Sequence, residues 1–211
     1  MSPTTLCIVR HGETDWNTER RIQGHMNIAL NAVGLAQAEA TARGIVGQNI
    51  AAIYSSDLMR ALQTAERLSP VSGVPVQPES GLRERHFGRM QGMTYDEMLA
   101  LDASEAERFK SRDLYDDFGG GEMLIAFADR IHATVERLAS RHAGQTILLV
   151  THGGVLDIIH RRAAGRDLSS PRDFVVPNAA LNWVEVDADG WRLLMWADRR
   201  HLEKTIEQSV E

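Results

Sequence analysis

The chain has 211 residues, of which 43% are hydrophobic and 25% are charged, close to the composition of an average globular domain. This composition excludes disordered, collagen-like and coiled-coil proteins, and no stretch approaches the roughly 18 apolar residues of a membrane-spanning helix. The net charge of −6 argues against nucleic-acid partners, which require a basic face. We therefore expect a single domain over residues 1–211, with no nucleic-acid and no membrane partner.

The amino-terminal residues and the cysteine content indicate the cellular compartment. The first residues lack the basic segment and the long apolar run of a secretory signal. Cys7 is the one cysteine, so no internal disulfide can form. We expect a cytoplasmic protein that is a monomer or a homodimer.

Strands and helices are expected to alternate along the chain. Asn31 and Asp57 are suited to begin helices as caps, and Pro70 should end the second of these. Short apolar runs predict strands over 6–10, 51–55 and 146–151, with a final hairpin of 181–186 and 191–196. Helices are expected over 31–47, 57–68, 94–112, 122–142 and 155–164. This order predicts a three-layer α/β/α sandwich around a mostly parallel, mixed sheet.

Residues 94–122 differ from the rest of the chain in hydrophobicity and charge. The segment holds nine acidic residues against Arg108, Lys110 and Arg112, which leaves a local charge of −6. A weakly hydrophobic segment of this kind predicts a small helical lid inserted over one end of the sheet.

Two strands of the predicted sheet end in a histidine followed by glycine. His11 and Gly12 follow Arg10 at the end of strand 6–10, and His152 follows strand 146–151. One such histidine is typical of a surface or core position. Two of them indicate a site, because ligands of open α/β sheets bind beyond the carboxyl ends of the strands. Gly12 would let the backbone come close to that ligand.

Either a metal ion or an anion could occupy such a site. A zinc site requires three or four ligands, often at short spacing, and neither His11 nor His152 has such partners in the sequence. Arginines favour the anion, since Arg10 adjoins His11 and Arg60 lies in the first turn of the helix after the second strand. We expect no metal and no cofactor. His86, His132, His142, His160 and His201 are expected at the surface.

The segment Arg10-His-Gly-Glu-Thr-Asp-Trp-Asn17 resembles the R-H-G-x-[ST]-x-W-N signature of the histidine phosphatase superfamily, phosphoglycerate mutase-like branch. Asn27 and Ala29 stand where that family usually has Asp and Pro. Four further segments are similar to other motifs of the family and occur in the family's order: 24–38, 55–65, 82–92 and 150–155.

The resemblance implies a role for each candidate residue. His11 would be the nucleophile that forms a phosphohistidine. Arg10, Arg60 and His152 would stabilise the phosphoryl oxygens. Glu84 would protonate the leaving alcohol and then activate water, although its position alone would favour an ion pair with Arg83 or Arg85. Further contacts to the substrate are expected from Asn17, Gln23, Gly24 and Gly153.

The resemblance also implies a histidine acid-type phosphatase or a phosphoglycerate mutase-like phosphotransferase. Hydrolysis of a small phosphorylated metabolite is favoured, because the acidic segment 94–122 should repel the more highly charged ligands of a mutase. Phosphoglycerate mutase activity remains the alternative. A phosphate-binding protein without catalysis is the non-enzyme alternative, and an assay with an aryl phosphate would separate it from the other two.

Overall fold

A six-stranded sheet forms the centre of the protein in the computed structural model, which describes residues 2–207 and the side chains as far as Glu203. The strand order is β3-β2-β4-β1-β5-β6, with the first four strands parallel and the last two antiparallel to their neighbours. The bounds are Thr4–Arg10 (β1), Ile50–Ser55 (β2), Val76–Pro78 (β3), Thr146–Thr151 (β4), Leu181–Asp187 (β5) and Gly190–Asp198 (β6).

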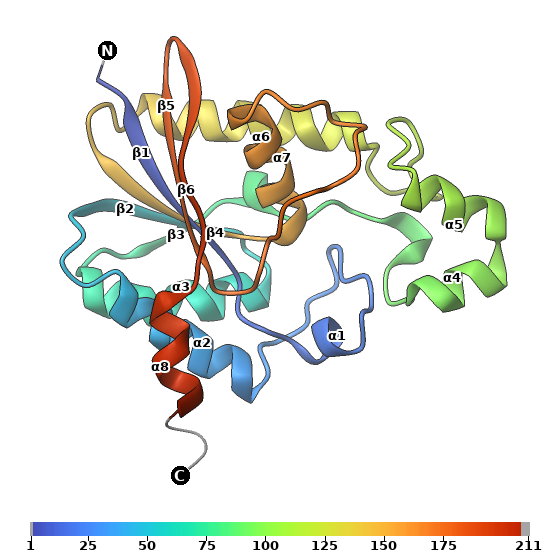
Figure 1. The fold of residues 1–211 in the computed structure, drawn as a ribbon, viewed down its shortest axis with the longest axis horizontal. Helices are drawn as coiled ribbons and strands as arrows, with labels where there is room; N and C mark the ends of the chain where they lie inside the picture. Colours follow the sequence, from blue (N-terminus) through green and yellow to red (C-terminus); the bar gives the residue numbers. More distant parts are fainter. Residues whose placement is uncertain (1, 208–211) are drawn as a thin grey trace.

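Helices cover both faces of the sheet, which confirms the predicted three-layer sandwich (Figure 1). On one face lie α2 (Ala32–Gly44) and α3 (Met59–Ser72), together with α8 (Arg200–Glu207) packed on α2. On the other lie α6 (Leu124–Ser140) and α7 (Gly153–Ala163). Each face has its own apolar core, and α6 contributes every third or fourth residue to the larger one. None of the described helices is long and apolar enough to cross a membrane.

The insertion over one end of the sheet contains two short helices, α4 (Tyr95–Leu101) and α5 (Ala103–Lys110), and the single helix expected over 94–112 is wrong (Figure 1). The chain breaks at Asp102, whose backbone is extended and whose carboxylate caps α5 by accepting from the Glu105 N–H at 3.0 Å. A small apolar core of Met90, Met98, Ala106 and Phe118 holds the insertion together.

Helix α3 differs from its prediction at both ends. Leu58, not Asp57, is the N-cap, and the Asp57 carboxylate instead accepts from Arg83 at 2.6 and 2.5 Å. Pro70 lies inside the helix, because the last turn can lose one backbone hydrogen bond without ending. The helix ends at Gly73, whose left-handed backbone favours glycine.

Four shorter or terminal features also depart from expectation. Helix α1 (Asp15–Thr18) and helix α8 were not expected, and two 3-10 turns follow β3, at Ser80–Leu82 and Gly88–Met90.

His160 is buried rather than exposed, since its ring stacks on Phe174 with centroids 3.6 Å apart. The cytoplasmic location and the oligomeric state stay predictions.

Parallel pairing brings the ends of three strands to one edge of the sheet. Arg10 at the end of β1 is in register with Thr151 at the end of β4, and Ser55 of β2 is in register with Val150. The ladder continues one step beyond, since the His11 N–H donates to the Thr151 carbonyl at 2.9 Å. His11, Ser56 and His152 therefore follow their strands at the same level.

Gly12 and Gly34 let two backbone segments touch behind this edge. A Cβ on Gly12 would lie 2.4 Å from the Gly34 carbonyl oxygen, and a Cβ on Gly34 would lie 2.0 Å from the Glu13 carbonyl oxygen. The backbone of Gly12 thus lies against α2, and this contact fixes the loop after His11.

Replacement of Gly34 by alanine should destabilise the protein, because neither backbone can yield as a flexible side chain would. We expect Gly34→Ala to lower the free energy of unfolding by about 1–3 kcal/mol, measured by denaturant titration. Val33→Ala, at an exposed position of the same helix, should change it by less than about 0.5 kcal/mol. Equal effects of the two substitutions would contradict a role for the close approach.

Candidate active site

Two histidines and two arginines converge at the carboxyl edge of the sheet. His11, Arg60 and His152 are buried, and the two imidazole rings lie 5.2 Å apart between centroids. The Arg60 Nε–H points at His11 Nε2 from 3.3 Å. The structure thus brings together four of the five residues expected to carry the chemistry, from β1, α3 and the turn after β4.

The surroundings of His11 fix its tautomer. Its Nδ1 lies 2.7 Å from the Gly12 carbonyl oxygen, which can only accept, so Nδ1 carries the proton. The lone pair is then on Nε2, the atom that faces Arg60. Burial, helped by the positive charges of Arg60 and Arg10, holds the pKa of His11 well below its usual range, although the bond to Gly12 opposes this. His11 is therefore a neutral imidazole at neutral pH, with the lone pair of Nε2 free of a proton.

His152 is held by a hydroxyl group that sequence analysis did not single out. Its Nε2 lies 2.7 Å from Ser56 Oγ, which also accepts from the Leu58 N–H. The Ser56 hydroxyl can thus donate to Nε2, which leaves the proton of the imidazole on Nδ1. That Nδ1 is buried and has no hydrogen-bond partner among the described residues. Ser56 belongs to the 55–65 motif, so its position, though not its role, was visible in the sequence.

Arg10 and Arg60 are fixed by backbone carbonyl groups rather than by carboxylates. Arg10 Nη1 donates to Val176 at 2.6 Å, and Arg60 donates to Met26 and Gly24 at 2.8 Å each. Burial lowers the pKa of each arginine to about 10, opposed by Glu84, so both stay charged at neutral pH. Neither has an ion pair among the described residues. The orphaned Nε of Arg10 and Nδ1 of His152 are the donors that an anion would satisfy.

Glu84 lies beside this cluster with its carboxylate on two backbone groups. Oε1 accepts from the Arg85 N–H and Oε2 from the Gly154 N–H, both at 2.9 Å. Its interpretation as an ion-pair partner is wrong, because the Arg83 guanidinium pairs with Asp57 and the Arg85 guanidinium donates to carbonyl groups. Among the residues that the structure describes, Glu84 thus has no side-chain partner, and backbone groups alone hold its carboxylate.

The remaining candidates surround the cluster in different ways. Thr14 is the N-cap of α1, and Asn17 completes the capping box, since its Oδ1 accepts from the Thr14 N–H at 3.0 Å. Gln23 is buried with its Oε1 unpartnered, and Gly24 holds Arg60 through its carbonyl group. Gly153 is the first residue of α7 and faces Arg10.

One supporting residue had no sequence signal. The Asn178 side-chain amide donates to the His11 carbonyl at 2.9 Å and lies 3.4 Å from Asn17 Oδ1. It precedes β5 and therefore reaches the site only because β5 pairs with β1.

Several carboxylates of the insertion pair with arginines from other parts of the chain. Five ion pairs join it to its surroundings: Glu97 with Arg21, Asp102 and Glu105 with Arg89, Glu122 with Arg130, and Arg112 with Asp157. A sixth pair, Arg108 with Asp116, lies within it. The ion pairs leave fewer free carboxylates than the local charge of −6 suggests, so this charge alone does not show that the segment repels anionic ligands.

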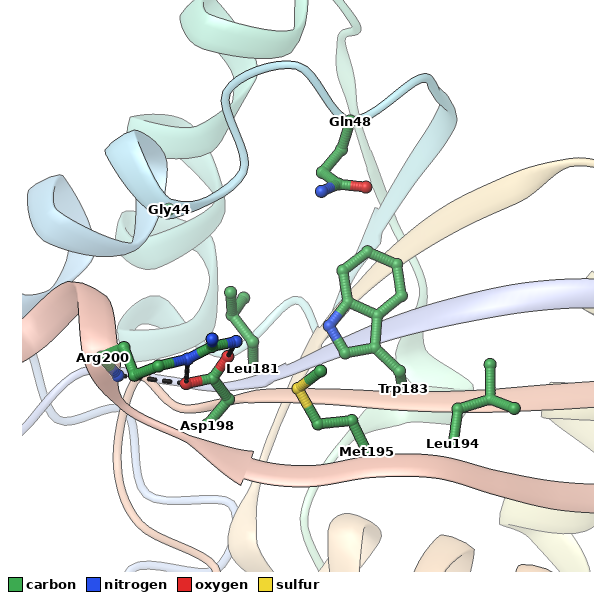
Figure 2. Close-up of a pocket in the computed structure, with 8 residues that line it drawn as sticks. All are labelled: Gly44, Gln48, Leu181, Trp183, Leu194, Met195, Asp198 and Arg200. Carbon is green, nitrogen blue, oxygen red and sulfur yellow. Dashed lines mark hydrogen bonds and ion pairs between the residues drawn. The ribbon is translucent and has the colours of Figure 1, made fainter.

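A separate hollow of about 390 Å³ lies where β5 and β6 meet the end of α2 (Figure 2). Its wall includes Trp183, Leu194 and Met195, and the Arg200 guanidinium there is engaged by Asp198. It contains none of the residues expected to act in catalysis or substrate binding.

The chain is similar to known proteins along most of its length. The family model described as the histidine phosphatase superfamily (branch 1) matches residues 6–199. A phosphoglycerate mutase-like protein 4 of Arabidopsis thaliana is 39% identical over 95% of this chain and 87% of its own length. A metal-independent phosphoserine phosphatase of the same plant is 37% identical over 94% and 83%. A mycobacterial glucosyl-3-phosphoglycerate phosphatase solved with VO3 has a TM-score of 0.83 and 30% identity, over 92% and 99% of the two chains.

The low pKa values of His11 and His152 predict how stability depends on pH. Burial lowers both below their ordinary value of 6.5, so the unfolded chain binds more protons than the folded chain below that pH. The free energy of unfolding should therefore fall as the pH drops from about 7 to about 5. Denaturant titrations across this range should show a shallower fall for His152→Gln. Parallel curves for the two proteins would mean that His152 does not contribute.

Proposed function

This chain belongs to the histidine phosphatase superfamily, and we propose that it hydrolyses small phosphorylated metabolites through a phosphohistidine on His11. The observation that carries the proposal is the buried, positively charged cluster around His11 Nε2. Arg10 and His152 offer donors without partners there, and Arg60 lies 3.3 Å from the nucleophilic atom. Such preorganised charge is what phosphoryl transfer requires.

In the first step His11 Nε2 attacks the phosphorus atom and the bond to the leaving oxygen breaks. A protonated Glu84 carboxyl group gives its proton to that oxygen, in keeping with the histidine acid-type phosphatase that we propose. Arg10, Arg60 and His152 stabilise the charge on the three other phosphoryl oxygens.

In the second step a water molecule attacks the phosphorus atom and the P–N bond breaks. The Glu84 carboxylate takes a proton from this water, and inorganic phosphate leaves. Both steps use the same cluster of donors, and the enzyme returns to its starting protonation state. No step in this sequence calls for a metal ion.

Phosphoglycerate mutase activity is the second candidate, because a close relative has a mutase-like name. A mutase would use the same phosphohistidine and pass the phosphoryl group to a sugar acid instead of water. Two relatives named as phosphatases support water as the acceptor.

Phosphate should be trapped on His11 during turnover. Rapid quenching during hydrolysis of 4-nitrophenyl phosphate in EDTA, followed by mass spectrometry, should detect a phosphate on His11 that is labile in acid and stable in base. His11→Ala should abolish turnover, because no neighbouring side chain can replace the nucleophile. His132→Ala is the control and should not change turnover, because His132 lies toward the opposite end of the sheet from His11. It packs on Trp191, which pairs with Val186, and Val186 pairs with the start of β1.

An unphosphorylated His11 at full turnover, or substantial activity in His11→Ala, would contradict the mechanism. Activity lost in EDTA and restored by zinc or magnesium would contradict metal-free catalysis. The acceptor is tested with 3-phosphoglycerate primed by the 2,3-bisphosphate. Formation of 2-phosphoglycerate much faster than phosphate release from any ester would establish the mutase.

Gly154 should be required for the position of Glu84. A Cβ at Gly154 would lie 2.1 Å from Glu84 Oε1, so the flexible carboxylate, rather than the backbone, must move. A displacement of about 1 Å can lower a rate about 10²-fold, and we expect this loss for alkyl phosphates in Gly154→Ala. Aryl phosphates, whose leaving groups need less protonation, should lose less. The free energy of unfolding should change little.

The effect of Gly154→Ala should not add to the loss of Glu84 itself. Glu84→Gln should slow alkyl ester hydrolysis by about 10²–10⁴-fold. The double variant should be little worse than Glu84→Gln, because both changes remove the same group. Full additivity would show that Gly154 acts independently of Glu84.

A further inference from the structure

A cavity of about 440 Å³ opens between the insertion, α6 and α7, beside Glu84. Gly154, whose N–H donates to the Glu84 carboxylate, forms part of its wall, and so does Arg85, the next residue after Glu84. In the proposed reaction the leaving oxygen of the substrate lies at Glu84. The rest of the leaving group therefore extends toward this cavity.

Much of the cavity wall is apolar and aromatic. Phe109 comes from α5, Phe87 from the segment after Glu84, and Phe127 from α6, with Leu124 and Ile158 between them. The rings of Phe87 and Phe109 lie 5.8 Å apart between centroids. Such a wall excludes water and favours a leaving group with apolar or aromatic surface.

The polar residues of the cavity carry an excess of positive charge. Lys110, Arg112 and Arg172 line it together with Arg85, against Asp157 as the one carboxylate in the wall. The Asp157 carboxylate is already shared, since Arg112 donates to it at 2.7 Å and Arg172 at 2.8 Å. Arg161 behind the wall also donates to it, at 3.0 Å. One negative charge therefore faces three guanidinium groups.

Arg85 adds a further cation to the wall, and it has no ion pair among the described residues. It is only 5% exposed, and its Nε and Nη2 donate to carbonyl groups rather than to a carboxylate. Its guanidinium lies 5.4 Å from the ring centre of Phe87 and 5.0 Å from that of Phe118. A cation so far from water is costly unless an anion comes close to it. Lys110, also in the wall, is exposed and has no ion pair among the residues described.

We propose that this cavity selects substrates whose leaving alcohol or phenol combines an apolar body with an anionic group. The apolar body packs against Phe87, Phe109 and Phe127. The anionic group, a carboxylate or a phosphate-type group, is attracted by Arg112, Arg172 and Lys110. This inference rests on the proposed phosphatase function, and it names the substrate class that the sequence did not give.

Four phenyl phosphates with different para substituents test the proposal. The substituents are carboxymethyl, phosphonomethyl, methyl and aminoethyl, which vary the charge while the ester bond stays on a similar phenol. We expect kcat/KM for the carboxymethyl or phosphonomethyl ester to exceed that of the methyl ester by about 10–100-fold, the range for a charge-assisted contact. The aminoethyl ester should be the poorest. The ratio of the two anionic esters distinguishes a carboxylate from a phosphate-type group.

Variants connect the selectivity to the cavity. Arg112→Gln should reduce the ratio of the better anionic ester to the methyl ester by about tenfold. Arg112 also binds Asp157, so its replacement could disturb the wall itself. Lys110→Gln, at an exposed position, is therefore the second variant and should reduce the same ratio by about 2–5-fold. Arg67→Gln, which removes the same charge at an exposed position of α3, should leave the ratio unchanged.

Each outcome separates this inference from the function on which it rests. Hydrolysis of all four esters at similar kcat/KM, or a ratio that Arg67→Gln lowers as much as Lys110→Gln does, would overturn the inference and leave the phosphatase intact. Failure to hydrolyse these esters and 4-nitrophenyl phosphate alike would overturn the proposed function, and the inference with it.

Discussion

The site depends on two guanidinium groups that are held beside two imidazoles away from water. Neither guanidinium group is paired with a carboxylate in the described part of the chain. Arg10 and Arg60 keep their charge at neutral pH although burial lowers the pKa of each to about 10. Removing such charges from water is costly, and backbone carbonyls of Gly24, Met26 and Val176 supply part of what water gave. The donors that stay unpaired are those that an incoming phosphoryl group would meet.

The sheet explains how four such groups can be held together. Parallel pairing of β1 with β4 ends the two strands at one level, so His11 and His152 leave the sheet side by side. Their surroundings leave the proton on Nδ1 in both imidazoles but engage a different nitrogen in each. The Gly12 carbonyl accepts a hydrogen bond from Nδ1 of His11, so that ring offers the lone pair of Nε2, whereas Ser56 binds Nε2 of His152, so that ring offers the N–H of Nδ1.

The sequence was informative where local patterns decide structure, and silent where distant segments do. Apolar runs and the histidines after them predicted the sheet and the residues at its edge. The prediction that Asp57 caps α3 was wrong because Arg83, which is distant in sequence, binds the Asp57 carboxylate. The contact of Gly12 with Gly34, and the approach of Asn178 to His11, likewise depend on tertiary packing that no local pattern encodes.

The charge around the insertion also depends on tertiary contacts that its own sequence does not encode. Its composition is acidic, yet Arg21, Arg89 and Arg130 reach it from other segments and pair with four of its carboxylates. Its own basic residues Lys110 and Arg112 face the cavity beside Glu84. The composition of the insertion therefore predicted negative charge near the substrate, whereas the cavity beside Glu84 is lined mainly by positively charged residues. The chemistry at the phosphorus atom depends on the sheet edge, whereas the part of the substrate that leaves meets a wall of different charge, built by the insertion, α6 and α7.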